Sequence, residues 1–113
     1  MTIYSHERYA KLLAKVEEQI RSLSSLKGGE YAGDTDRLAN FRRNADALGV
    51  PMETIWAVYY NKHHDAVMQW IKDKQEGKTR QRLEGIDGRA TDMIVYLTLF
   101  LALVEEGEEA SGE

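Results

Sequence analysis

Hydrophobic residues recur every three or four positions in four stretches of the chain, a spacing that places side chains on one face of an α-helix. The first stretch spans residues 5–24, and its apolar face is made of Tyr9, Leu12, Leu13, Val16, Ile20 and Leu23. The second spans residues 36–48, and its apolar face is made of Leu38, Phe41, Ala45 and Leu48. Each pattern predicts a helix with one buried side.

The third and fourth stretches have wider apolar surfaces. Residues 51–74 predict a long third helix, whose apolar arc holds Ile55, Trp56, Val58, Tyr59, Ala66, Val67, Trp70 and Ile71. The fourth stretch, residues 88–106, is apolar on nearly every side between Met93 and Val104. A helix of that kind is typically central in a bundle or buried between subunits. We therefore expect the fourth helix to be the least exposed, and we expect two copies of the chain to form a homodimer.

Capping and stop residues mark the ends of these helices. Ser5 can cap the first helix, and Gly49 is a natural stop for the second. Pro51 suits the first turn of the third helix, and Gly77 lies near its end. The predicted fold is all-α, a four-helix bundle-like single domain over residues 1–106. Residues 107–113 are acidic, lack bulky apolar side chains and are expected to form a disordered tail.

Charge and composition narrow the class of protein. The chain has 113 residues, a formal net charge of −4 and no cysteine. An acidic chain lacks the positive charge that non-specific nucleic-acid binding requires. A local patch could still bind phosphates, because residues 72–82 hold five basic residues, Lys72, Lys74, Lys78, Arg80 and Arg82, against only Asp73 and Glu76. The N-terminus does not have the layout of a signal peptide, and the longest apolar run, residues 93–104, is shorter than the roughly 20 residues that cross a bilayer. We expect a soluble cytoplasmic protein without disulfides and without a membrane partner.

Four charged residues fall at the edges of apolar faces on the third and fourth helices. Lys62 and Asp65 are neighbours on the third helix, and Arg89 and Asp92 are neighbours at the start of the fourth. A charge at such an edge is costly unless it is paired, so we expect the four to meet in one polar cluster. Two simpler interpretations stay open: an exposed ion pair on the third helix, and a first-turn Asp92 held by Arg89 and the helix dipole.

Candidate metal ligands are present in the same region. His63, Asp65, Glu84 and Asp92 offer nitrogen and oxygen atoms. His63 and Asp65 diverge on a helix, and no pair of histidines has metal-ligand spacing. Magnesium held by Asp65 and Asp92 therefore fits the pattern better than zinc, because magnesium uses few protein ligands together with water and phosphate oxygens.

The order of several short motifs resembles a known family. They are Tyr31-Ala-Gly-Asp34, Asn40-Phe41, Leu48-Gly49-Val50-Pro51, Lys62-His63-x-Asp65-Ala66 and Glu84-Gly-Ile-x-Gly-Arg89-x-x-Asp92-x-x-x-Tyr96. Over about residues 27–104 the chain is similar to small helical bacteriophage and prophage proteins grouped as the nucleotide modification associated domain, type one. The resemblance implies a link to nucleotide metabolism or DNA modification. It also implies a set of ligand-binding positions, which here are Tyr31, Lys62, Asp65, Arg89, Asp92 and Tyr96.

A more distant resemblance is to the all-α nucleoside triphosphate pyrophosphatases of the MazG type, which hold magnesium with acidic pairs on neighbouring helices. The chain departs from them because Arg89 stands where a Glu is wanted three residues before Asp92. Whether the protein is an enzyme is therefore left open at this point.

Two functions follow from these observations. In the first, the protein binds a nucleotide or another phosphate-bearing ligand, with Lys62 and Arg89 on phosphate and Asp65 and Asp92 orienting them or holding magnesium. In the second, it is a non-enzymatic interaction protein, such as a phage inhibitor that binds a host protein of defence or metabolism. A structural dimer without a ligand is a third interpretation.

Overall fold

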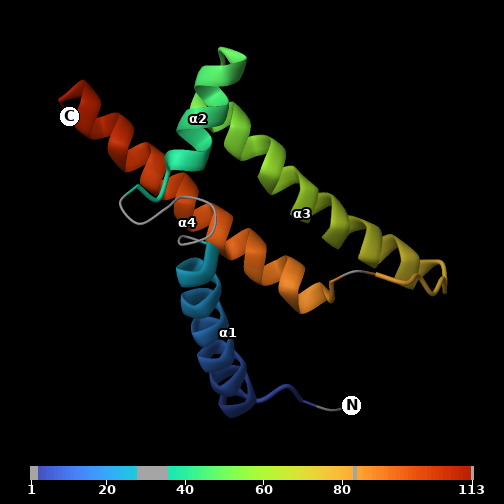
Figure 1. Cartoon of the computed structure of the whole chain (residues 1–113). Coiled ribbons are helices and arrows are strands. Elements are labelled where there is room, and N and C mark those ends of the chain that lie inside the picture. Colours follow the sequence, from blue (N-terminus) through green and yellow to red (C-terminus); the bar gives the residue numbers. More distant parts are fainter. Residues whose placement is uncertain (1–2, 28–35, 83, 113) are drawn as a thin grey trace.

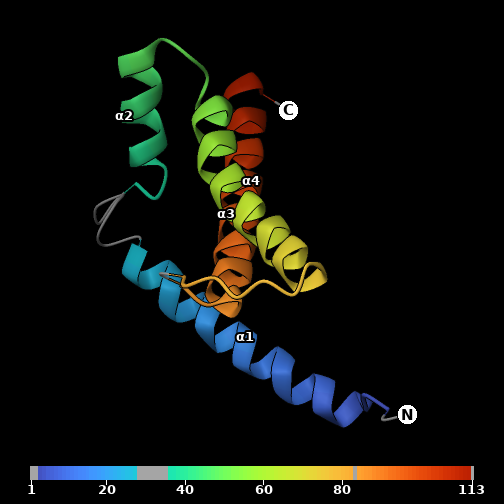
Figure 2. The ribbon, with the colours of Figure 1, turned by 90° about the vertical axis from the view of Figure 1, so that its right-hand side faces the viewer.

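The computed structural model describes residues 3–27, 36–82 and 84–112, and these residues form four α-helices and no strand. The helices are α1 (His6–Lys27), α2 (Ala39–Leu48), α3 (Met52–Gln75) and α4 (Ile86–Ser111). The all-α, bundle-like fold predicted from the periodicity is confirmed. Helices α3 and α4 run antiparallel side by side, α2 packs on α3, and α1 crosses the beginning of α4 (Figures 1 and 2).

The hydrophobic core lies where α2, α3 and α4 meet. Its buried members are Leu38, Phe41, Ala45, Ile55 and Leu103. Aromatic rings extend this core along the α3–α4 seam: the ring of Phe41 lies 6.3 Å from that of Tyr59 and 6.4 Å from that of Tyr96. The indole N–H of Trp56 donates a 2.6 Å hydrogen bond to the backbone oxygen of Tyr96. This bond ties the two long helices together at mid-length.

Most of the predicted helix ends are present. The Ser5 hydroxyl accepts a 3.1 Å hydrogen bond from the Arg8 backbone N–H. Gly49 has φ 66°, a left-handed conformation that costs glycine little, and it ends α2 as predicted. Helix α2 starts at Ala39 rather than at residue 36. The cause is Asp36, whose carboxylate accepts a 3.0 Å bond from the Leu38 N–H and holds a turn before the helix.

Helix α4 is longer than the pattern predicts. It begins at Ile86, two residues before the predicted start, and continues to Ser111. Residues 107–111, expected to be disordered, are therefore helical in the structure. Glutamate and alanine are good helix formers, and Gly112 with φ 77° ends the helix.

An arginine on α2 forms hydrogen bonds with the C-terminal part of α4. Arg42 donates 2.8 Å and 2.6 Å hydrogen bonds to Asp36 and Glu106. These bonds lower the pKa of both carboxyl groups below their ordinary values. Glu106 therefore has a specific partner on α2, which favours continuation of the helix beyond it.

Helix α4 is only half covered by the rest of the chain. Thr91, Asp92, Val95 and Leu103 are buried, as expected for a central helix. The opposite face is exposed and consists of Ile94, Leu97, Leu101 and Val104. None of the helices in the described ranges is long and apolar enough to cross a membrane. The expectation of a least-exposed fourth helix thus holds for one face of α4 and is wrong for the other.

Helix α1 is the least embedded element. Among the described helices it packs on α4 alone, mainly through its second half, where the Thr91 hydroxyl lies 3.5 Å from the Gln19 side-chain oxygen. The first half projects away from the other helices, on the side where α4 begins (Figure 2). Its apolar residues Tyr9, Leu12 and Leu13 are exposed, although they continue the face that packs on α4.

The core predicts the effect of two matched substitutions. Leu103→Ala removes a side chain that is 2% exposed and should lower the free energy of unfolding by about 2–5 kcal/mol. Leu48→Ala removes the same atoms from a site that is 69% exposed and should cost about 0.5 kcal/mol or less. Urea unfolding followed by circular dichroism measures both. Equal losses in the two variants would contradict this description of the core.

Candidate functional site

A buried polar cluster lies between α3 and the start of α4. His63 occupies the inward face of α3, one turn after Tyr59, and Asp92 occupies the second turn of α4. Both side chains are buried, and His63 Nδ1 lies 3.5 Å from Asp92 Oδ2. The imidazole ring also packs against the ring of Tyr96, at 5.4 Å between centroids. The cluster therefore lies directly beside the aromatic part of the core, between the same two helices.

Arg89 links the buried cluster to the surface. Its Nη1 lies 3.3 Å from His63 Nδ1 and 3.2 Å from Glu84 Oε2. The same imidazole nitrogen cannot accept a hydrogen bond from Arg89 and donate one to Asp92 at the same time. The cluster therefore has two alternative hydrogen-bonding arrangements, and the tautomer of His63 decides between them.

The cluster also offers a possible set of metal ligands. His63, Glu84 and Asp92 each provide one ligand atom, and these atoms lie within 4.8 Å of one another. However, the Arg89 guanidinium already contacts two of the three groups and supplies a permanent positive charge there. A metal ion would have to displace it, and magnesium prefers all-oxygen ligands. The residues as arranged do not fit a magnesium site.

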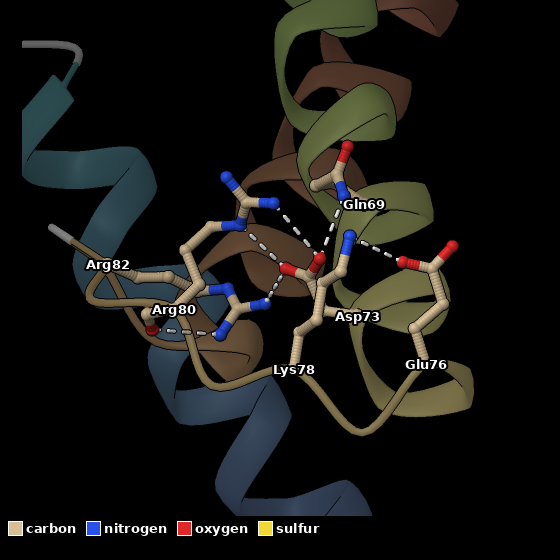
Figure 3. A network of polar contacts seen from close by, with 6 residues as sticks. All are labelled: Gln69, Asp73, Glu76, Lys78, Arg80 and Arg82. Atoms are coloured by element: carbon tan, nitrogen blue, oxygen red, sulfur yellow. Dashed lines mark hydrogen bonds and ion pairs between the residues drawn. The ribbon is translucent and has the colours of Figure 1, made fainter.

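A second cluster surrounds Asp73 near the end of α3 (Figure 3). Its carboxylate is 1% exposed and accepts bonds from Gln69 at 2.9 Å, from Arg80 at 2.7 and 3.1 Å, and from Arg82 at 2.7 Å. Hydrogen bonds from Arg80 and Gln69 hold the pKa of Asp73 well below its ordinary value. Asp73 is thus an ionised carboxylate that fixes the connector between α3 and α4.

The chain geometry after α3 explains how the connector reaches Asp73. Gly77 has φ 68° and turns the chain back, so that the Lys78 N–H donates a 2.8 Å bond to the Asp73 backbone oxygen. Lys78 also forms an ion pair with Glu76 at 2.8 Å. The connector consequently runs back along α3 and presents Arg80 and Arg82 to the same carboxylate (Figure 3).

Between the two clusters the surface is hollowed. The hollow has a volume of about 180 Å³, and its walls come from α3, the connector and the start of α4. It is lined by Ala66, Gln69, Trp70, Arg80, Arg82, Glu84, Ile86 and Arg89. Three arginines therefore border one depression that also has an apolar wall.

The structure brings together only part of the residue set expected from the sequence. Arg89, Asp92 and Tyr96 do lie around one centre. Lys62 is exposed, and Asp65, with a side chain that is 82% exposed, pairs with His64 at 3.8 Å. Asp65 is therefore not beside Asp92, because residues 63 and 65 point in different directions on a helix. Tyr31 lies outside the described residues.

Sequence reasoning did not find two of the central groups. The sequence pattern indicates His63 only as a metal ligand and does not indicate a role for Asp73. The sequence feature that indicates their burial is their position. Tyr59, His63, Trp70 and Asp73 recur on one face of α3 at helical spacing. A charged or titratable residue on a buried face needs a partner. The charged partners of Asp73 are Arg80 and Arg82, which follow it by seven and nine residues and lie beyond the end of α3.

Comparison with known proteins adds no relative. No family model matches the chain, no curated protein is similar enough to count as a match, and no solved structure matches its fold.

The Asp73 cluster predicts a specific pH dependence. Because the folded-state pKa is lowered, the carboxylate stabilises the fold above its unfolded pKa of about 3.9, and this contribution disappears as the pH falls below that value. Asp73→Asn should therefore be less stable than the wild type at pH 7. The difference should shrink steadily as the pH falls below about 4.

Chemical unfolding across pH 2–7 measures this difference. The exposed variant Asp65→Asn is the matched control and should track the wild type at every pH. A stability difference for Asp73→Asn that does not change with pH would show that the ionised carboxylate is not what the arginines stabilise.

Proposed function

We propose that the protein binds a nucleotide or another phosphate-bearing small molecule in the hollow between α3, the connector and α4. The observation that carries this proposal is the presence of Arg80, Arg82 and Arg89 around one depression of about 180 Å³. Guanidinium groups fit phosphate oxygens with two parallel hydrogen bonds, which makes arginine a preferred residue for phosphate recognition.

The local charge supports an anionic ligand. Arg80 and Arg82 share the single carboxylate of Asp73, so this group of three carries one net positive charge. Arg89 pairs with Glu84, whose side chain is about half exposed. The half-exposed Glu84 carboxylate can return to solvent, so a phosphate group can replace it as the partner of Arg89, whose own side chain is 19% exposed.

The apolar part of the hollow supports a ligand larger than phosphate. Trp70, Ile86 and Ala66 line it together with the charged groups. An indole is a good stacking surface for a nucleobase, and the Trp70 ring already carries the Lys74 ammonium 5.1 Å from its centre. A ligand with an aromatic ring and a phosphate would use both parts of the hollow.

The proposal departs from the residues expected from the sequence. Of the expected ligand-binding residues that the structure describes, only Arg89 lines the hollow. Lys62 and Asp65 are exposed outside it, whereas Arg80 and Arg82 join it. The resemblance to the nucleotide modification associated domain supports the same ligand class, and a bacteriophage origin and a cytoplasmic location accompany it as proposals. Because Arg89 stands in the cation position beside His63 and Glu84, the proposal is one of binding, and magnesium-dependent hydrolysis is not part of it.

We also propose that the protein is a homodimer. Its accessible surface is 8606 Å², whereas a folded monomer of 12.9 kDa has about 6,300 Å². Its radius of gyration is 17.1 Å, against about 13 Å for a compact chain of this length. The excess is about 2,300 Å² per chain, or about 4,600 Å² for two chains, which lies within the roughly 2,000–5,000 Å² that obligate homodimers bury in total. A host protein that covers this surface is the alternative, and it corresponds to the second function expected from the sequence.

Ligand binding can be tested with isothermal titration calorimetry. The probes are inorganic phosphate, adenosine, adenosine monophosphate and adenosine triphosphate. We expect the two nucleotides to bind more tightly than phosphate or adenosine alone, and their affinity to fall as the salt concentration rises. Arg82→Gln and Arg89→Gln should each weaken nucleotide binding at least about tenfold, the loss that accompanies removal of a hydrogen bond to a charged group.

Lys62→Gln is the matched control, because it removes one positive charge from α3 outside the hollow and should leave affinity unchanged. Circular dichroism establishes that each variant is folded. If none of the four probes bound, the ligand proposal would be wrong and the interaction protein would be the better account. If Lys62→Gln and Arg82→Gln weakened nucleotide binding equally, the overall charge of the protein would account for the binding and the proposed site would be wrong.

A further inference from the structure

We infer that two copies of the chain pair through the exposed faces of their α4 helices, in antiparallel orientation, and that α1 of each copy packs on the C-terminal half of its partner's α4. This inference rests on the proposed homodimer and specifies which surfaces form it. It assigns a role to the two apolar surfaces that the fold leaves exposed.

The exposed face of α4 has the spacing of a helix-pairing seam. Ile94, Leu97, Leu101 and Val104 are separated by three, four and three residues, which is the repeat of coiled coils. All four are exposed, and they lie on the opposite side of α4 from Asp92 and Leu103, which face α3. A surface with this pattern is complementary to a copy of itself, as a closed two-fold contact requires.

The first half of α1 provides the second surface. Tyr9 and Leu13 continue the stripe formed by Val16, Ile20 and Leu23, again at alternating steps of four and three residues. The later part of this stripe is partly buried on α4, whereas Tyr9 and Leu13 are exposed. The apolar stripe of α1 thus extends beyond its contact with α4, and no residue in the described ranges buries Tyr9 or Leu13.

Charge favours the antiparallel orientation. The C-terminal part of α4 carries the exposed carboxylates Glu105, Glu108 and Glu109, so a parallel pair would place two acidic ends together. In an antiparallel pair, each acidic end lies beside the beginning of the partner's α4. That is the place where the partner's α1 crosses (Figure 2).

The projecting half of α1 has the complementary sign. Arg8, Lys11 and Lys15 are exposed there, and only Glu7 opposes them. Antiparallel pairing therefore places a basic segment of α1 next to the acidic end of the partner's α4. The charges favour this orientation, and the same orientation places the exposed apolar residues of α1 beside the partner's α4.

The first test is the oligomeric state of two matched variants. Leu101→Glu places a carboxylate on the α4 seam at a residue that is 65% exposed, and Val58→Glu does the same on α3 at a residue that is 66% exposed. Light scattering after size exclusion should give a dimer for the wild type and Val58→Glu. It should give a folded monomer for Leu101→Glu. A wild-type monomer would overturn both the homodimer and this inference, whereas a dimer unaffected by Leu101→Glu would overturn only the inference.

The second test is disulfide crosslinking. Because the chain has no cysteine, only the introduced cysteines can form a disulfide. In the antiparallel pair Ile94 faces the partner's Val104, and each residue is far from its own copy. A mixture of Ile94→Cys and Val104→Cys chains should form a disulfide dimer on mild oxidation, and neither variant alone should do so. Crosslinking of each variant with itself would show a parallel pair and contradict the inference. So would the absence of any crosslink in a mixture that remains dimeric.

The third test addresses the charges on α1. Lys11→Glu with Lys15→Glu should raise the dissociation constant of the dimer. Adding Glu105→Lys and Glu109→Lys to the same chain should lower it again, because the complementary signs are restored. Dilution experiments by analytical ultracentrifugation measure both changes. If the charge reversals left the dissociation constant unchanged, the proposed contact between α1 and the partner's α4 would be wrong.

Discussion

The structure depends on one constraint: helix α4 has apolar side chains around most of its circumference, and the chain has few elements with which to cover it. Helix α3 covers one side and the second half of α1 covers the next, which buries Val95 and Leu103. The remaining side, from Ile94 to Val104, stays in contact with solvent. The large surface area, the projecting α1 and the proposed dimer all follow from this incomplete coverage.

The same constraint shapes the candidate site. Arg89 and Asp92 lie at the start of α4, where the helix meets α3 and is removed from water. Buried charges need partners, and these are supplied by His63 on α3 and by Glu84 just before α4. At the end of α3, the buried Asp73 is likewise paired, with Arg80 and Arg82 of the connector. The arginines that balance these carboxylates then border the hollow in which we propose that a phosphate-bearing ligand binds.

Much of the fold could be predicted from the sequence, because local features determine it. Four helical periodicities, Ser5, Gly49 and Gly77 are sufficient for the number of helices and for several of their ends. The candidate site was harder, since it depends on contacts between distant parts of the chain. Lys62 and Asp65 have suitable chemistry but lie outside the inward face of α3, whereas His63 lies on it. A glycine turn brings Arg80 and Arg82 back to Asp73, and helical spacing carries no information about such a return.

The most direct test of the central claim is hydrogen exchange in the first half of α1. An isolated helical segment of about ten residues is marginal in water, so residues 6–15 of a monomer should exchange almost as fast as an unfolded peptide. In the proposed dimer the partner's α4 covers this segment. We therefore expect its amides to be protected at high protein concentration and to lose protection as the dimer is diluted. Rapid exchange of residues 6–15 at every concentration would contradict the account, because it would show that no partner helix covers the first half of α1.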